Sequence, residues 1–275
     1  MSQTATVVGP TYEVLALRYA THKGRTAGEN FLRPDDHAAA MPIDYYLWAV
    51  RSTMGAKPSV IVVDTGMGPD ALARRPGRTL LTPVADALSG AGIDAATVED
   101  VVITHMHYDH AGRLDVFPRA TFHIQDAEMA FCTGRAMCHE VLRSPIDADD
   151  VVAAVRYVHS GRMRFHDGAA EIAPGVTLHL IGGHTGGLQA VRVPTQRGWV
   201  VLASDATHLW ANIRTRNPFP IVADVTRMME GYRILESLAD GPDHIIPGHD
   251  PLVRTRFPCL PDQPDIVRLD LPPKS

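Results

Sequence analysis

Apolar and polar positions alternate in a way that divides the first half of the chain into strands, with one helix among them. Period-two alternation and short β-branched or aromatic runs are typical of strands. Residues 82–91 have helical spacing instead and end near Gly90 and Gly92, so we expect a helix there. Residues 21–37 are charged and contain glycine, which predicts a loop. The expected strands are 12–19, 43–50, 59–63, 101–103 and 120–124.

The second half shows the same order of strands and helices after a helical stretch. We interpret residues 125–164, with helices expected at 126–131 and 147–158, as an insertion that covers the functional site. Further strands are expected at 176–181, 188–193 and 199–203, then a helix at 224–238, a short apolar step at 244–246 and a Pro-rich tail. Two sheets packed face to face with helices outside satisfy this pattern. The predicted fold class is α/β (α+β): a four-layer αββα sandwich of two mixed β-sheets in a single domain over 1–275.

Composition agrees with a globular protein and narrows the partners. The chain has 275 residues, 45% of them hydrophobic and 21% charged, which suits one large domain. A net charge of −5 without a Lys/Arg block argues against nucleic-acid or membrane binding, so we expect a small-molecule partner. The three cysteines form no disulfide framework, and no leader-like or membrane-spanning apolar run is present. We therefore expect a soluble, cytoplasmic protein.

The chemistry of the chain is concentrated in the stretch from Thr104 to His110, which directly follows an expected strand. It contains three imidazoles and one carboxylate, the usual ligands of zinc and similar divalent ions. Because alternate side chains of an extended segment share a face, His105 and His107 are expected to point together. Asp109 and His110 lie past the strand and can turn toward a second point. The stretch therefore predicts a metal-binding loop.

Three more candidate ligands follow expected strands, where loops present functional groups on a rigid frame. They are His184, Asp205 and His249, each next to glycine or another small residue. Such a neighbour lets the backbone approach a site closely. A single histidine in such a place is more often a structural hydrogen-bonding residue. The assignment of His184, Asp205 and His249 as metal ligands therefore depends on their occurring together with the histidines of the Thr104–His110 stretch.

Taken in order, these residues resemble the metallo-β-lactamase superfamily of hydrolases from about Tyr12 to Phe257, and most of all its acyl-homoserine lactonase-like branch. The turn at Asp64, in Asp-Thr-Gly, resembles the early motif of that superfamily, and Pro-Gly-His at 247–249 resembles its last ligand loop. The resemblance implies two divalent metal ions, with Zn²⁺ the expected identity, while iron, manganese and cobalt accept similar nitrogen and oxygen ligands. It implies that His105, His107 and His184 hold one ion, that Asp109, His110 and His249 hold the other, and that Asp205 bridges them.

The same resemblance implies the reaction. A metal-bridging hydroxide would attack a lactone or ester carbonyl, as in a quorum-quenching lactonase acting on N-acyl-homoserine lactones, and Asp109 would pass a proton to the leaving alkoxide. Asp64 would orient a ligand histidine. The sequence departs from the lactonases at one point, because they have a tyrosine three residues after the bridging aspartate and this chain has His208. We expect His208 to donate a hydrogen bond to the substrate in place of that hydroxyl. The alternatives are that it serves as an acid, that it binds a different group of the substrate, or that it packs under the loop.

Two other functions remain open from the sequence. A glyoxalase-II-like thioester hydrolase resembles the chain at the same metal motif, although we find no Lys/Arg pair for glutathione in a C-terminal helical extension. A non-catalytic metal-binding protein would be expected to lose some of the seven ligands, and all are present. The arginines at 214, 216, 254 and 256 suit a carboxylate product, but surface arginines paired with acids are commoner. A homodimer is one expectation that the sequence leaves open.

Overall fold

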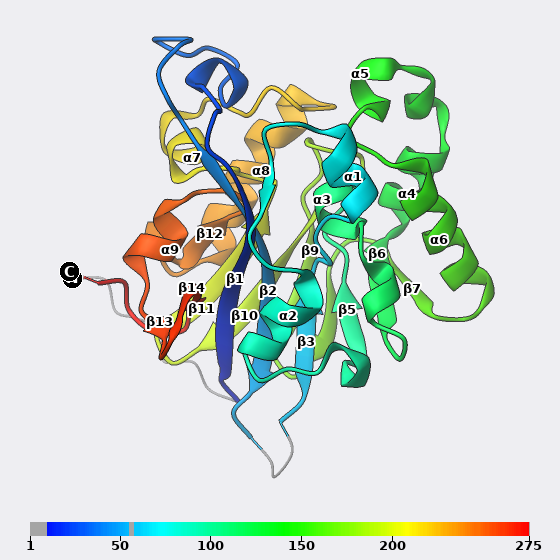
Figure 1. Cartoon of the computed structure of the whole chain (residues 1–275), viewed down its shortest axis with the longest axis vertical. Coiled ribbons are helices and arrows are strands. Elements are labelled where there is room, and N and C mark those ends of the chain that lie inside the picture. Colours follow the sequence, from blue (N-terminus) through cyan, green and yellow to red (C-terminus); the bar gives the residue numbers. More distant parts are fainter. Residues whose placement is uncertain (1–9, 55–57, 275) are drawn as a thin grey trace.

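The computed structural model describes residues 10–54 and 58–274, and within them the strands form two mixed β-sheets (Figure 1). The larger sheet contains β1 (Tyr12–His22), β2 (Ile43–Ser52), β3 (Val60–Val63), β4 (Thr79–Leu80), β5 (Asp100–Val102), β6 (Thr121–Gln125), β7 (Met163–His166), β13 (Cys259–Leu260) and β14 (Gln263–Arg268). The smaller sheet contains β8 (Ala170–Ala173), β9 (Val176–Leu180), β10 (Gln189–Thr195), β11 (Gly198–Ser204) and β12 (Ile245–Pro247).

The strand order places several strand ends at one edge of the fold. The larger sheet runs β13-β14-β1-β2-β3-β5-β6-β7, with β4 on β1, and β3, β5, β6 and β7 are parallel neighbours. The smaller sheet runs β12-β11-β10-β9-β8, with a parallel pair at β11 and β12. Carboxyl ends of parallel strands meet at the same edge of a sheet, which is where ligands bind in such folds.

Helices cover the outer face of each sheet (Figure 1). The helices of the described residues are α1 (Pro69–Arg74), α2 (Val84–Gly90), α3 (Tyr108–Ala111), α4 (Asp126–Thr133), α5 (Glu140–Arg143), α6 (Ala148–His159), α7 (Trp210–Thr215), α8 (Val225–Leu238) and α9 (Leu252–Arg256), of which α3 belongs to the loop after β5. Of the described helices, none combines the length and apolar character needed to cross a bilayer.

Three apolar clusters define the layers. One lies between the sheets, where Trp48 and Val63 of the larger sheet join Leu178 and Leu202 of the smaller one. A second packs α2, α4 and α6 on the outer face of the larger sheet, and a third packs α8 on the outer face of the smaller sheet. Burial of these apolar side chains is the main force that holds the layers together. The predicted αββα sandwich is confirmed.

The expected strands and helices occur within a few residues of their predicted bounds, but the Pro-rich tail is not a simple tail. Residues 259–268 form β13 and β14, and β14 pairs antiparallel with β1. The apolar signal there is only the buried pair Ile266 and Val267. So short a signal between prolines is not distinguishable from a loop by local pattern.

The segment 125–164 contains α4, α5 and α6, and its methionines and aromatics pack rather than line the site. Met129 is buried in the core cluster of the larger sheet's outer face, and Phe131 and Met137 pack against that cluster. This agrees with the commoner reason for apolar residues on a helix, which is contact with the core. The segment reaches the candidate site through Ser144 and Pro145, which line a cavity described below.

Candidate metal centre

Five strands end at one edge of the sandwich, and the residues after them converge there. Asp64 follows β3, the Thr104–His110 loop follows β5, and His184 follows β9. Asp205 follows β11 and His249 follows β12. The larger sheet supplies the early histidines, and the smaller sheet supplies the later three residues. The cluster therefore lies where the two sheets meet.

Asp205 lies between two groups of candidate ligands, one beside each of its carboxylate oxygens. Its Oδ2 is 3.2 Å from Nε2 of His184 and 3.8 Å from Nε2 of His105. Its Oδ1 is 3.1 Å from Nε2 of His249 and 3.3 Å from Nε2 of His110. Both oxygens thus face imidazole nitrogens, which is the arrangement that a bridging carboxylate requires.

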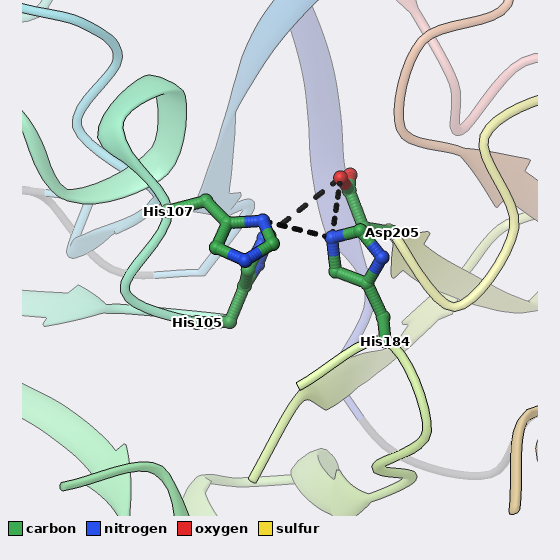
Figure 2. A group of neighbouring side chains, drawn as sticks. All are labelled: His105, His107, His184 and Asp205. Carbon is green, nitrogen blue, oxygen red and sulfur yellow. Dashed lines mark hydrogen bonds and ion pairs between the residues drawn. The ribbon is translucent and has the colours of Figure 1, made fainter. Parts of the chain in front are cut away.

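The first group consists of His105, His107 and His184 together with Asp205 (Figure 2). Nε2 of His184 is 2.9 Å from Nδ1 of His107, and Figure 2 shows these rings facing each other below the carboxylate of Asp205. The ligand atoms of this group all lie within 4.8 Å of one another. Four buried nitrogen and oxygen donors at this spacing match the ligand set of a divalent metal ion.

The second group consists of Asp109, His110 and His249, again with ligand atoms within 4.8 Å of one another. Oδ2 of Asp109 is 3.6 Å from Nε2 of His110 and 3.7 Å from Nε2 of His249. All three residues are buried. The loop after β5 thus contributes to both groups, with His105 and His107 in the first and Asp109 and His110 in the second.

The cluster contains buried polar atoms that no protein group satisfies. Within residues 10–54 and 58–274, no hydrogen-bond partner is found for Nε2 of His105, Nε2 of His110, Nδ1 of His184 or Oδ1 of Asp205. Leaving a buried donor or acceptor unpaired costs about 1–3 kcal/mol each. Several such atoms in mutual contact indicate that the cluster is built for ligands outside the chain, and the nitrogen and oxygen donors suit divalent metal ions.

Protonation of the histidines differs between the two groups. Burial, with help from neighbouring imidazoles, lowers the pKa of His105 and of His107 well below the usual range, so both rings are neutral and offer lone pairs at neutral pH. Burial also disfavours the cation of His110, but Asp205 and Asp109 outweigh it and raise the pKa of His110 well above its usual value. The carboxylates around His110 therefore stabilise a positive charge on its ring. A divalent cation bound in the second group would replace the proton of that ring.

Asp64 fixes the orientation of the ligand loop. Oδ2 of Asp64 is 2.7 Å from Nδ1 of His110 and accepts a hydrogen bond of 2.8 Å from the hydroxyl of Thr104, while Oδ1 accepts one of 2.8 Å from the amide of Thr104. Burial raises the pKa of Asp64, against the effect of the His110 ring. Asp64 and Ser204 have positive φ angles of 65° and 47°, a region that costs energy for residues other than glycine. Backbone strain is thus concentrated beside the cluster.

His249 is held from behind by the backbone. Its Nδ1 is 2.9 Å from the carbonyl oxygen of Asp44 on β2, which leaves Nε2 directed toward the cluster. The preceding Gly248 lies so close that an added Cβ would be 2.6 Å from Oδ1 of Asp205. Only glycine permits this approach, which explains the Pro-Gly-His motif.

His208 also belongs to the cluster. Its Nε2 is 2.8 Å from Oδ2 of Asp205, and its ring stacks on Phe219 with centroids 3.6 Å apart. Neither ring nitrogen has a hydrogen bond of acceptable geometry to any described residue. Burial lowers the pKa of His208 well below the usual range, against the effect of Asp205. The ring is therefore neutral and has a free nitrogen near the cluster.

A cavity of ≈ 180 Å³ opens beside the cluster. Its floor includes His107, Asp109, His184, Asp205 and His208. Its walls are formed by Arg25, Tyr45, Arg75, Arg78, Tyr108, Ser144, Pro145, Phe219 and Ile221. The arginines suggested by sequence for product binding do not line this cavity: Arg216 pairs with Glu236 at 2.6 Å and Arg256 with Asp243 at 2.7 Å.

Sequence reasoning missed Glu128, which connects the two ligand loops. The side chain of Glu128 on α4 is fully buried. It accepts hydrogen bonds from the amide of Met106 (2.8 Å), the hydroxyl of Thr185 (2.6 Å) and the amide of Gly187 (2.9 Å). A glutamate within an otherwise core-facing helical segment is the only local signal of this role. The carboxylate clamps the His107 loop to the His184 loop.

Replacing Glu128 by alanine should lower the free energy of unfolding by about 3 kcal/mol or more, because three buried donors lose their acceptor. Metal affinity should fall about 10- to 100-fold, as expected when support of the ligand loops is removed. Chemical denaturation and competition with a chromophoric chelator would measure both effects. Glu140→Ala, at an exposed position on α5, is the matched control and should change neither. Wild-type metal affinity in Glu128→Ala would show that the clamp does not position the ligands.

Known proteins resemble the chain in sequence and in fold. The family model described as metallo-beta-lactamase superfamily matches residues 56–249. An N-acyl homoserine lactonase from Bacillus cereus is 28% identical over 120 residues, which cover 43% of this chain and 42% of that protein. A probable metallo-hydrolase from Mycobacterium tuberculosis is 28% identical over 198 residues, covering 60% and 59%. The chain thus spans less than two thirds of these curated relatives.

A solved structure shares nearly the whole fold. A quorum-quenching N-acyl homoserine lactone lactonase superposes with a TM-score of 0.69 at 21% identity, over 92% of this chain and 95% of that one. The match of the family model covers most of the chain, and it includes the Asp64 turn, the Thr104–His110 loop, His184, Asp205 and His249. The chain therefore belongs to the metallo-β-lactamase superfamily.

Proposed function

We propose that this protein is a dinuclear metal-dependent hydrolase that opens a lactone or another carboxylic ester. The observation that carries the proposal is the position of Asp205, with Oδ2 facing His184 and His105 and Oδ1 facing His249 and His110. A single carboxylate between two ligand groups suits a pair of ions rather than one. The proposed ligands are His105, His107 and His184 for one ion, Asp109, His110 and His249 for the other, and Asp205 for both.

Zn²⁺ is the proposed identity of both ions, because the donors are imidazoles and carboxylates in compact groups. Bound divalent ions of this kind lower the pKa of water and polarise a carbonyl. A structural zinc site is typically closed by four protein ligands, whereas seven residues here would serve two ions. The proposal therefore leaves room for substrate, and the ≈ 180 Å³ cavity beside the cluster supplies the space.

Asp109 is proposed to carry the proton. Its carboxylate lies among the imidazoles of the second group, and the residue also lines the cavity. Ring opening converts the ester oxygen into an alkoxide, which needs a proton to leave. A carboxylate that reaches both the cluster and the substrate can take the proton released by the attacking water and pass it to that oxygen. We further propose that the chain acts as one domain, with segment 125–164 forming one wall of the site.

His208 is proposed to donate a hydrogen bond to the substrate carbonyl oxygen. It lines the cavity, its ring is held by stacking on Phe219, and its Nδ1 has no hydrogen-bond partner among the described residues, while Nε2 lies 2.8 Å from Oδ2 of Asp205. A fixed donor at a carbonyl stabilises the negative charge that develops in the transition state. This is the role that the resemblance gives to the tyrosine of the lactonases.

His208→Ala should lower kcat/KM by about 100-fold while leaving bound metal unchanged, because one transition-state donor is lost and no ligand is. Steady-state kinetics with metal analysis would measure both quantities. His208→Tyr places a hydroxyl donor in the same loop and should recover part of the rate. Loss of metal in His208→Ala would instead make His208 a ligand, in agreement with its 2.8 Å approach to Asp205.

A hydrolysis panel tests the proposed function. Metal-analysed protein would be given lactones, linear esters, thioesters and phosphodiesters, with acid release followed by pH indicator. We expect turnover of lactones or carboxylic esters that disappears with the metal. A preference for S-acyl glutathione would replace the proposal by a thioester hydrolase, and no turnover of any carboxylic ester by fully loaded protein would refute it.

A further inference from the structure

Three arginines line the cavity beside the candidate metal centre, and one of them is neutralised within the protein. Nη2 of Arg75 pairs with Oδ1 of Asp147 at 2.7 Å, and its guanidinium lies over the ring of Tyr108 at 3.9 Å. This arginine already has a counter-charge and an aromatic contact. The other two, Arg25 and Arg78, have neither an aspartate nor a glutamate as ion-pair partner within the part of the chain that the structure describes.

Arg25 is a buried cation whose hydrogen bond and ring contact are to neutral groups, and the Glu29 carboxylate, which acts on it through space, forms no ion pair with it among the described residues. Arg25 is only 8% exposed, its Nη2 donates to the carbonyl oxygen of Glu29 at 2.6 Å, and its guanidinium lies 4.9 Å from the centre of the Phe219 ring. Its Nε has no hydrogen-bond partner among residues 10–54 and 58–274. Moving a guanidinium out of water without an ion-pair partner costs more free energy than a hydrogen bond to one carbonyl and contact with one aromatic ring recover. The binding of an anion would offset this cost.

Arg78 also lines the cavity; its hydrogen bonds are to neutral groups, and the Asp109 carboxylate acts on it through space without forming an ion pair among the described residues. Its Nε donates to the hydroxyl of Tyr108 at 2.9 Å, and its Nη1 donates to the carbonyl oxygen of Pro76 at 3.2 Å. Tyr108 is next to Asp109 in the sequence, so this bond ties the guanidinium to the loop that carries the candidate ligands. Arg78 is half-buried, which leaves its charge poorly screened by solvent.

Tyr45 lines the same cavity as the two cations, and Asp109 lines it as well. The hydroxyl of Tyr45 is buried and has no hydrogen-bond partner among the described residues. The unsatisfied groups here, Arg25 Nε and the Tyr45 hydroxyl, are hydrogen-bond donors beside two positive charges.

We propose that Arg25, Arg78 and the hydroxyl of Tyr45 bind a carboxylate of the substrate, so that the preferred substrate is a small lactone or ester bearing a second, negatively charged group. This inference rests on the proposed function. Guanidinium groups match the geometry of a carboxylate, and charge-assisted hydrogen bonds are stronger than neutral ones. The cavity of ≈ 180 Å³ is below the roughly 300–1,000 Å³ of common ligand pockets, which favours a short substrate over a long acyl chain.

Binding of matched anions tests the inference independently of turnover. Isothermal titration of metal-analysed protein would compare 2-hydroxyglutarate with 4-hydroxybutyrate, two ring-opening products that differ by one carboxylate. We expect the dicarboxylate to bind about 10- to 100-fold more tightly, as one charge-assisted contact allows. Arg25→Gln and Arg78→Gln should each remove most of that difference. Arg33→Gln, an exposed arginine of the same loop as Arg25, is the matched control and should keep it.

Steady-state kinetics provide a second test of the carboxylate-binding inference. A γ-butyrolactone with a 5-carboxylate would be compared with its 5-carboxamide, and the anion should have a KM lower by about tenfold. Arg25→Gln should raise KM for the anion only, Arg25→Lys should restore part of it, and Tyr45→Phe should have a smaller effect in the same direction. Equal binding of the two products, or equal KM values for both lactones, would overturn the inference while leaving the hydrolase intact. Absence of all ester turnover would refute the hydrolase, and the titration would still decide whether the arginines bind carboxylate.

Discussion

Replacing Asp205 by alanine should abolish turnover, with a fall in kcat/KM of about 10⁴-fold or more. The reason is geometric, because Asp205 is the residue whose two oxygens reach both ligand groups, at 3.1–3.3 Å from His249, His184 and His110. Its loss leaves each group with three ligands and no shared anion. Metal analysis of the purified variant should show weak retention of both ions.

Two further variants make the Asp205 result interpretable. Asp205→Asn keeps the shape of the side chain but removes its charge, and it should retain part of the metal with little activity. Asp86→Ala, at an exposed position on α2, removes a carboxylate remote from the cluster in sequence and fold and should leave kinetics unchanged. An Asp205→Ala protein that keeps two ions and turns over at the wild-type rate would contradict the proposed bridging role.

Removal of metal should inactivate the protein and lower its Tm by about 10 °C. Two sites, each with ligand at about 100 times Kd, contribute about 2.7 kcal/mol apiece, which is about 5 kcal/mol together. Buried atoms of His105, His110, His184 and Asp205 would then be left without partners. Differential scanning calorimetry before and after dialysis against a chelator would measure the change.

Adding metal back distinguishes the loss of the ions from irreversible damage to the protein. Adding Zn²⁺ back to the chelated protein should recover both Tm and activity, and other divalent ions can be ranked by the same assay. The Asp205→Ala variant serves as an internal control, because a protein that has already lost its ions should show little change of Tm on chelation. An equally stable and equally active chelated wild type would exclude a metal-dependent mechanism.

Much of the fold was predictable because the signals are local. The run 59–63 and the alternation over 12–19 read as strands, and β3 and β1 lie there. The tail was misread because β14 depends on distant partners, as Leu17 pairs with Ile266 across the length of the chain. A strand that is specified mainly by such distant pairing has a weak local pattern, which in β14 is the apolar pair Ile266 and Val267.

The residues of the candidate site likewise include some that the sequence predicted and others that it did not. The seven candidate ligands are visible because each follows an apolar strand and two of them, His184 and His249, lie beside glycine, and the structure brings all seven together. Glu128, Arg25 and Tyr45 gave no comparable signal. Their roles depend on contacts between segments far apart in sequence, such as Glu128 with Gly187 and Arg25 with Phe219. A buried charge can be recognised only when its surroundings are known.

The pairing of β14 with β1 also affects how the chain can be made. β1 lies between β2 and β14, and Arg18 on β1 forms an ion pair with Asp265 beside β14's buried residues. During synthesis the first strand must therefore wait, with one edge uncovered, until residues 259–268 have left the ribosome. An uncovered edge can pair with another chain, and contacts of such long range form slowly. Nascent molecules should accordingly be exposed to edge-to-edge association until β14 emerges and covers this edge of β1.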